Sequence, residues 1–277
     1  MYKVIYNKKI NTNSYEMAIE APLVIKNALP GQFVIIMASA DGEKIPLSIY
    51  DIDKEKNILY VIYQVVGAST YLLSKETSEI YSVTGPLGRP SEICTNLDKF
   101  KDKKIIYVAG GIGSAPVYNQ VKYLKENNIN IDVIYGARNI DLFIIKEKLE
   151  KVSNNLYYVS DDGSFGEKGF VTNVLERIID NYDICVAIGP VIMMKNVVEL
   201  TKKHNIRSIV SMNPIMVDGS GMCGACRCLI EGKPRFACID GPEFDGDKVD
   251  FDSALKRMNT YKEEEKSLLE KFGENHG

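Results

Sequence analysis

The sequence predicts a mixed fold in which an all-β unit is followed by an α/β unit and then by a small cysteine-rich unit. Three observations support this. Short apolar segments separated by turn residues fill the first third, and strands alternate with helical segments in the middle. In addition, four of the six cysteines lie between Cys223 and Cys238. We place the three units at residues 1–98, 99–212 and 213–277.

The composition is that of an ordinary globular protein, with 45% hydrophobic and 26% charged residues in a chain of 277. A formal net charge of -3 gives no electrostatic reason to expect nucleic-acid binding. The apolar stretches at 33–40 and 105–118 are too short or too interrupted by glycine to span a bilayer, and the N-terminus MYKVIYNKKI lacks signal-peptide features. We therefore expect a cytoplasmic protein that does not act on a membrane.

Residues 1–98 are expected to form an antiparallel β-barrel, because short strands recur at regular spacing. Turn formers such as Pro30-Gly31 and Asp41-Gly42 separate these strands. The expected strands are 2–6, 14–19, 32–37, 47–53, 58–65 and 80–83, and a helix is expected at 68–74.

Two segments of this unit are candidates for ligand contacts. One strand runs through Gly67 into the expected helix, where backbone amides and the hydroxyls of Ser69 and Thr70 are suited to a pyrophosphate. The alternative is that these hydroxyls merely cap the helix. The second segment consists of Ile45, Pro46, Leu47 and Ser48.

Residues 99–212 alternate between strands and helices, which is typical of a parallel, Rossmann-like sheet with helices on both faces. The expected strands are 104–109, 131–135, 156–160, 184–188 and 208–212. The expected helices are 117–126, 145–152, 170–178 and 192–202. Ligands of such sheets bind beyond the carboxyl ends of the strands.

A glycine-rich loop follows the first of these strands and opens a helix, which is where a nucleotide phosphate docks. It lacks the full Gly-x-Gly-x-x-Gly fingerprint, and close strand–helix packing is the alternative reason for its glycines. Asp161 and Asp162 would repel a 2′-phosphate and favour NAD(H) over NADP(H), whereas Arg138 favours the opposite. The candidate nucleotide-binding residues are Gly110, Gly111, Gly113, Ser114, Ala115, Pro116, Gly136, Arg138, Asp161, Asp162, Gly189 and Pro190.

The cysteine-rich unit has the spacing of a plant-type 2Fe-2S site, with an acid in the first position: Asp218, Cys223, Cys226 and Cys238. Zinc held by three thiolates and a carboxylate, a structural disulfide, and Cys-x-x-Cys thiol exchange are the alternatives. Cys228 is interpreted as a non-ligand, with replacement of Asp218 as the alternative. The tail at 253–272 is expected to form a partly amphipathic helix.

The order of barrel, nucleotide sheet and cysteine cluster resembles the ferredoxin-reductase-like electron-transfer proteins over nearly the whole chain. Two kinds of small subunit are more closely similar. One is the electron-transfer subunit of type B dihydroorotate dehydrogenase, which has four cysteine ligands. The other is the small subunit of the electron-bifurcating NADH-dependent reduced ferredoxin:NADP+ oxidoreductase, often called a sulfide dehydrogenase subunit. It has aspartate in the first ligand position, and it is the better match to NPIMVDGSGMCGACR and FACIDGPEFDGDKVDFD.

The resemblance implies FAD in the barrel, NAD(H) on the sheet and a 2Fe-2S cluster in the last unit. Segment 45–48 matches the flavin motif Arg-Pro-x-Ser, with Ile45 in place of the arginine. Loop 110–116 matches the nicotinamide nucleotide loop, and Gly189-Pro190 matches a Cys-Gly-Pro phrase in which Ile188 replaces the cysteine. The strand residues implied to lie beside the flavin are Ile62, Tyr63 and Gln64.

The same resemblance implies direct hydride transfer between nicotinamide and flavin, so no catalytic acid or base is expected. Electrons would then pass through the cluster to or from a larger flavin and iron–sulfur subunit that reacts with NADP(H) and ferredoxin. The dihydroorotate dehydrogenase and sulfide dehydrogenase subunits are alternatives of the same class. A zinc-bearing binding module and a flavoreductase without a partner are alternatives of other kinds.

Overall fold

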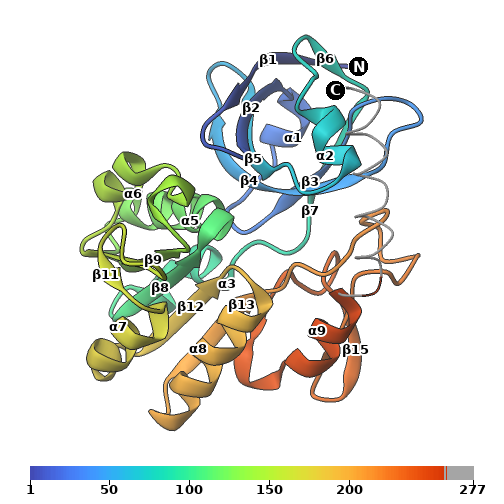
Figure 1. Cartoon of the computed structure of the whole chain (residues 1–277). Helices are drawn as coiled ribbons and strands as arrows, with labels where there is room; N and C mark the ends of the chain where they lie inside the picture. The colour runs from blue at the N-terminus through green and yellow to red at the C-terminus, as the bar shows by residue number, and fades with distance from the viewer. Residues whose placement is uncertain (259, 261–277) are drawn as a thin grey trace.

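A computed structural model of the chain describes residues 1–258 and 260. Figure 1 shows its three units, with the barrel above, the parallel sheet and its helices at the lower left, and the orange and red cysteine-rich unit at the lower right. The fold class expected from the sequence is confirmed.

The first unit is a nearly closed antiparallel barrel of seven strands in the order β6-β1-β2-β5-β4-β3-β7. Its interior is filled by aliphatic side chains such as Met17, Ile36 and Leu59, which alternate with outward-facing residues along each strand. The elements are β1 (Tyr2–Lys9), β2 (Ser14–Glu20), α1 (Pro22–Ile25), β3 (Phe33–Met37), β4 (Ile45–Asp53), β5 (Ile58–Gln64), α2 (Ala68–Leu73), β6 (Glu79–Ile80) and β7 (Ser82–Leu87).

The expected strand at 80–83 is two strands in the structure. β6 pairs with β1, whereas β7 crosses to β3 and continues to Leu87. Residues 84–89 have the sequence of a tight loop, but β7 continues to Leu87, with a register shift between Phe33 and Ile35 of β3 where it passes Gly85 and Pro86. The short helices α3 (Glu92–Thr95) and α4 (Leu97–Phe100) then lead into the second unit.

The second unit is built on a sheet in the order β11-β10-β9-β8-β12-β13-β16, parallel except for β16. The chain leaves β8 toward β9 on one side and returns to β12 on the other, so the strand order reverses between β8 and β12. The elements are β8 (Ile105–Gly110), η1 (Gly111–Gly113), α5 (Ser114–Glu126), β9 (Asp132–Ala137), η2 (Ile140–Leu142), α6 (Lys146–Val152), β10 (Leu156–Ser160), β11 (Glu167–Lys168), α7 (Val171–Ile178), η3 (Ile179–Asn181), β12 (Ile184–Ile188), α8 (Val191–Lys203) and β13 (Arg207–Ser211).

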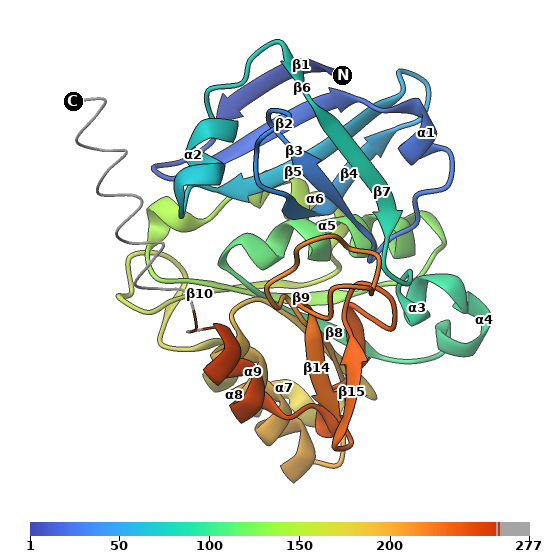
Figure 2. The ribbon, with the colours of Figure 1, turned by 90° about the vertical axis from the view of Figure 1, so that its right-hand side faces the viewer.

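The third unit is a hairpin and a helix that pack beside this sheet, as Figure 2 shows. β14 (Arg227–Ile230) pairs with β15 (Lys233–Phe236), and β16 (Glu243–Asp245) pairs with β13 and so extends the sheet of the second unit. The 3-10 turn η4 (Gly246–Lys248) precedes α9 (Phe251–Met258).

The expected tail helix is present in part. Helix α9 buries Phe251 and packs Ala254, Leu255 and Met258 against the same core, an apolar stripe at helical spacing. The remainder of the expected helix, beyond Met258, lies outside the described residues apart from Thr260. None of the described helices has the length and apolar character needed to cross a membrane.

Candidate functional site

A cleft of about 1110 Å³ separates the barrel from the carboxyl ends of the parallel strands. Strands β4 and β5 form one wall, and the loops after β8, β9, β10 and β12 form the other. This volume is somewhat larger than a pocket for one small ligand, so the cleft has room for two cofactors. The predicted site residues that line it are Pro46, Leu47, Ser48, Ile62, Gln64, Gly110, Gly111, Gly113, Ala115, Pro116, Gly136, Arg138, Asp161, Gly189 and Pro190.

The glycine loop sits where the strand order reverses, which is the usual ligand position in an open α/β sheet. A Cβ atom on Gly113 would lie 2.2 Å from the carbonyl oxygen of Ile188, so this glycine lets the loops after β8 and β12 touch. Gly111 differs, because it has a φ of +53° and its added Cβ would meet nothing within 4 Å. The loop therefore has a packing glycine and a glycine that leaves backbone open to the cleft.

Other predicted residues lie outside the cleft lining. Ile45 and Tyr63 are buried in the barrel, and the Tyr63 hydroxyl donates to Asn7 Oδ1 at 3.0 Å. Ser114 is also buried and donates to the Tyr135 hydroxyl. Asp162 is exposed and accepts the Ser164 amide.

The start of α2 lies at the edge of the cleft, to which Val66 contributes while Gly67, Ser69 and Thr70 do not. Thr70 Oγ1 accepts the amides of Val66 and Gly67 at 3.0 and 3.1 Å. The Ser69 hydroxyl donates to the Glu43 carboxylate. Thr70 therefore acts as a helix cap here, the alternative that the sequence left open.

The cleft also contains residues that sequence reasoning missed. The clearest is Phe170, whose side chain is 65% exposed although it precedes a helix within a folded unit. The sequence signal that could have identified Phe170 is an aromatic residue between a glycine and the start of a helix. Further lining residues are Asn13, Phe33, Ile192, Met193, Asn196, Met212, Asn213, Pro214, Met216 and Pro242.

The predicted cluster ligands lie in two pairs, Asp218 with Cys223 and Cys226 with Cys238. The sulfur atoms of Cys226 and Cys238 lie 3.1 Å apart, and all six cysteines are free thiols, so these two do not form a disulfide. The Ser220 amide donates to Asp218 Oδ1 at 2.8 Å and, with the nearby Cys223 side chain, holds the pKa of Asp218 below its usual range. Asp218 is thus a carboxylate, the form that binds metal.

This arrangement fits a two-iron cluster. Within residues 1–258 and 260, no three acidic, thiol or imidazole groups surround one point closely enough to hold a single ion. A 2Fe-2S centre does not need such a group, because four protein ligands are shared between two irons. Cys226 and Cys238 form one close pair, and Asp218 with Cys223 forms the other.

Cys228 stands apart from these pairs. It is buried on β14, and its sulfur lies 3.9 Å from the carbonyl oxygen of Cys226. It packs in the hydrophobic core shared by the cysteine-rich unit and the sheet. This environment supports its interpretation as a non-ligand.

The cluster loop is continuous with the wall of the cleft. Met216 lines the cleft two residues before Asp218, and Pro242 lines it four residues after Cys238. A Cβ on Gly219 would lie 2.7 Å from both Ile35 of β3 and Leu87 of β7, so the loop lies directly against the barrel. A cofactor in the cleft and a cluster on this loop would therefore be neighbours.

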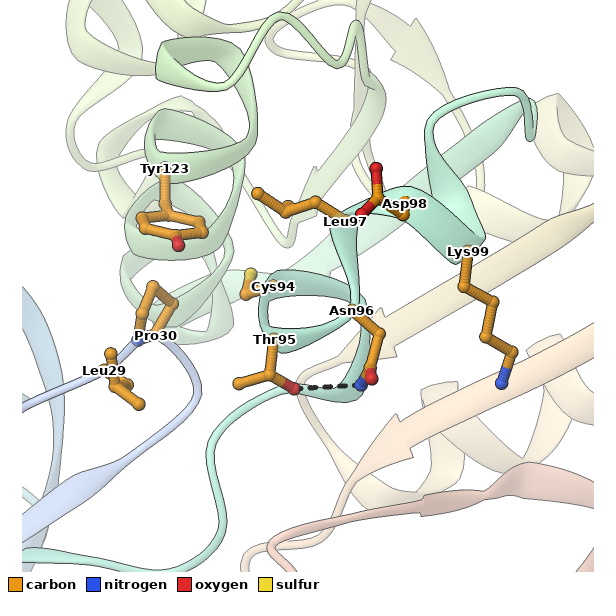
Figure 3. A pocket seen from close by; sticks show the side chains of 9 residues that line it. All are labelled: Leu29, Pro30, Cys94, Thr95, Asn96, Leu97, Asp98, Lys99 and Tyr123. Carbon is orange, nitrogen blue, oxygen red and sulfur yellow. Dashed lines mark hydrogen bonds between the residues drawn. The ribbon is translucent and has the colours of Figure 1, made fainter.

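A second, smaller hollow of about 540 Å³ is lined by a different set of residues (Figure 3). Leu29 and Pro30 of the barrel, helices α3 and α4, and Tyr123 of α5 form its walls. Burial raises the pKa of Cys94, one of the lining residues, well above the usual range, so that sulfur stays a thiol. None of the predicted site residues lines this hollow.

The comparisons agree with the geometry. Residues 107–199 match the oxidoreductase NAD-binding domain, and residues 213–250 match the iron–sulfur cluster binding domain of dihydroorotate dehydrogenase B. An uncharacterized Clostridium beijerinckii protein is 48% identical, covering 98% of this chain and 94% of its own. A Thermotoga maritima homolog of the electron transfer subunit of dihydroorotate dehydrogenase B (NAD(+)) is 42% identical, covering 98% and 95%.

A solved structure of the NADH-dependent reduced ferredoxin-NADP oxidoreductase, described for flavin-based electron bifurcation, contains a chain that is 41% identical to this one. The match has a TM-score of 0.90 and covers 98% of each chain. The cofactors are NAD(H), FAD and a 2Fe-2S cluster. The chain therefore belongs to the family of oxidoreductase electron-transfer subunits that includes those of dihydroorotate dehydrogenase B and their homologs.

Proposed function

We propose that this chain is the small, NAD(H)-linked subunit of an electron-bifurcating NADH-dependent reduced ferredoxin:NADP+ oxidoreductase. It would carry electrons between NAD(H), FAD and its cluster, to or from a larger flavin and iron–sulfur subunit that reacts with NADP(H) and ferredoxin. The observation that carries the proposal is Asp218 in the first ligand position, in a chain that matches the oxidoreductase structure from end to end.

Different residues of the cleft would bind FAD and NAD(H). Pro46, Leu47 and Ile62 offer an apolar wall to the flavin, while the open backbone at Gly111 accepts phosphate of NAD(H). When bound, FAD supplies the exchange between two-electron hydride transfer and one-electron transfer. The protein's task is to stack the two rings and exclude water, which requires no side-chain acid or base.

The nucleotide end of the cleft selects the cofactor. Phe170 presents an exposed ring on which the adenine base can stack, and Asn196 lines the same cleft. Arg138 and Asp161 are both exposed cleft residues. The Asp161 carboxylate would repel a 2′-phosphate, which favours NAD(H), and Arg138 can pair with the pyrophosphate.

The cluster end of the molecule offers a surface for the larger subunit. Val217, Met222 and Ile239 lie next to cluster ligands in sequence and are 52%, 90% and 46% exposed. Large apolar side chains grouped in this way favour a protein contact, and Cys223 is itself exposed among them. We assign this face to the partner subunit, because electron transfer requires its acceptor to approach the cluster.

The experiment is isolation of the native complex through a tag on this chain, with analysis of flavin, iron and acid-labile sulfide. The expected result is a larger flavin and iron–sulfur subunit, and NADP+ reduction that requires both NADH and reduced ferredoxin. Mock isolation from untagged cells is the control. Zinc without flavin would overturn both the proposal and the cofactor assignment.

A second candidate function is electron transfer for dihydroorotate oxidation. It is favoured by the match of residues 213–250 to the iron–sulfur domain of dihydroorotate dehydrogenase B. The same isolated complex distinguishes the two functions. A partner that reduces NAD+ with dihydroorotate would establish this second function and exclude the first.

A further inference from the structure

Arg257 reaches from α9 to the loop between two cluster ligands. Its Nη2 atom donates to the carbonyl oxygen of Ala225 at 3.0 Å, and Ala225 lies between Cys223 and Cys226. The guanidinium Nε is buried and has no hydrogen-bond partner among the described residues. The side chain as a whole is half-buried, so its charge is partly withdrawn from water.

The helix that bears Arg257 is fixed on two sides. The Asp250 amide, just before α9, donates to the carbonyl of Leu229 on β14 at 2.9 Å. Asp252 accepts Lys195 Nζ of α8 at 2.8 Å. The guanidinium is therefore delivered by a packed element, and its contact with the cluster loop is not a chance meeting of surface side chains.

The charge of Arg257 is not neutralised nearby within the described part of the chain. Arg207 pairs with Glu92 and Asp245, and Arg235 approaches Asp240, but Arg257 makes no such ion pair there. One-electron reduction adds negative charge to an iron–sulfur centre, and a nearby fixed cation favours that reduced state.

We propose that Arg257 is a positioning residue of the cluster that holds the Cys223–Cys226 loop through Ala225 and raises the reduction potential of the centre. The inference rests on the assignment of the cluster to Asp218, Cys223, Cys226 and Cys238. It does not depend on which partner subunit the chain serves.

Arg89 provides a matched control. Its Nε donates to the carbonyl of Ile239 at 3.2 Å, next to the ligand Cys238, just as Arg257 contacts the neighbour of Cys226. Arg89, however, is exposed, so solvent screens its charge. The two arginines thus make the same kind of contact beside the cluster and differ in burial.

The test compares wild type with Arg257→Met, Arg257→Lys and Arg89→Met in the full chain. The cluster potential is measured by redox titration followed by electron paramagnetic resonance, and cluster loss to an iron chelator is timed. Arg257→Met is expected to shift the potential downward and to lose iron severalfold faster. Arg257→Lys keeps the charge and should keep the potential, but it should lose iron faster than wild type because its single ammonium group replaces a planar fork.

An unchanged potential in Arg257→Met, or an equal shift in Arg89→Met, would overturn the electrostatic part. Iron loss at the wild-type rate in both Arg257 variants would overturn the positioning part. If Arg257→Met retains no cluster, the reduction potential of Arg257→Lys decides. A lowered potential in that variant would contradict the charge effect, because lysine keeps the positive charge. A wild-type chain without a 2Fe-2S spectrum would instead remove the cluster assignment itself.

Discussion

At the scale of single residues, two carboxylates are central to the expected chemistry of the cluster and of the nucleotide site. Asp218 is a carboxylate held by the Ser220 amide, and Asp161 is an exposed carboxylate at the cleft. The sequence alone suggests a role for each, because each prediction rests on a side chain's own chemistry at a recognisable spacing, and both roles stay predictions. Asn196 was missed because only the folded sheet brings it to the cleft, whereas Phe170 was missed although its place between Gly169 and a helix start was a sequence signal.

Asp218→Cys is expected to lower the cluster potential by about 60 mV or more, a tenfold change in the one-electron equilibrium. A thiolate donates more electron density to iron than a carboxylate does, which disfavours reduction. Redox titration of the isolated chain measures the effect. Asp240→Asn is the control, because Asp240 follows Cys238 closely but accepts the Phe236 amide. An equal or higher potential in Asp218→Cys would refute the prediction.

Asp161→Asn is expected to improve the use of NADPH relative to NADH by roughly fivefold, since it removes repulsion of the 2′-phosphate worth about 1 kcal/mol near water. The ratio of kcat/KM for the two nucleotides with an artificial electron acceptor is the measurement. Asp162→Asn serves as the control, because Asp162 is the next residue in the chain and is also exposed, but does not line the cleft. If both variants change the NADPH/NADH ratio of kcat/KM equally, the change reflects net charge alone and contradicts a specific role for Asp161.

At the scale of elements, local pattern was enough for most strands and helices. The alternating strands and helices of 99–212 all formed, because buried β-branched runs and helical periodicity are local signals. Two strand assignments that were missed depend on distant partners. β7 needs β3 to continue past Pro86, and β16 is a strand only because β13 leaves an edge open beside it.

Gly113→Ala is expected to reduce the free energy of unfolding by about 1–3 kcal/mol, because the added methyl would overlap the Ile188 carbonyl. NAD(H) binding should weaken as well, since the loops after β8 and β12 must separate. Denaturant unfolding and nucleotide titration would measure these effects. Gly67→Ala is the control, as its added methyl meets nothing within 4 Å, and a comparable loss there would contradict this account.

At the scale of the whole molecule, one buried carboxyl joins all three units. Glu243 of β16 accepts Gln120 Nε2 of α5 at 2.6 Å, and Tyr107 of β8 donates to the same Gln120. The hydroxyl of Ser91, before α3, lies nearby. Burial raises the pKa of Glu243 above its ordinary value.

This raised pKa predicts a pH dependence of stability. The folded protein binds the Glu243 proton more tightly than the unfolded chain, so its contribution is fully present below the unfolded pKa and is lost as pH rises through the folded pKa. Glu243→Gln should therefore gain stability relative to wild type as pH rises above the ordinary pKa of a glutamate, about 4.5. Urea unfolding at several pH values tests this, and a pH-independent difference between the two proteins would count against it.

Glu92→Gln supplies the opposite case. Burial acts to raise the pKa of Glu92, but hydrogen bonds from Lys99 and Arg207 outweigh it and hold the pKa below its usual range. Its contribution is present above the unfolded pKa and is lost as pH falls through the folded pKa. The two variants should thus diverge from wild type in opposite directions across the acidic range.

The pairing of β16 with β13 has a consequence beyond electron transfer. Without residues 243–245, β13 would present a row of unpaired amides and carbonyls at the edge of an apolar sheet. Such an exposed edge strand can pair with a strand of another molecule. The segment that follows the iron–sulfur ligands therefore also guards against self-association, and a chain cut back to its two larger units would be prone to aggregate.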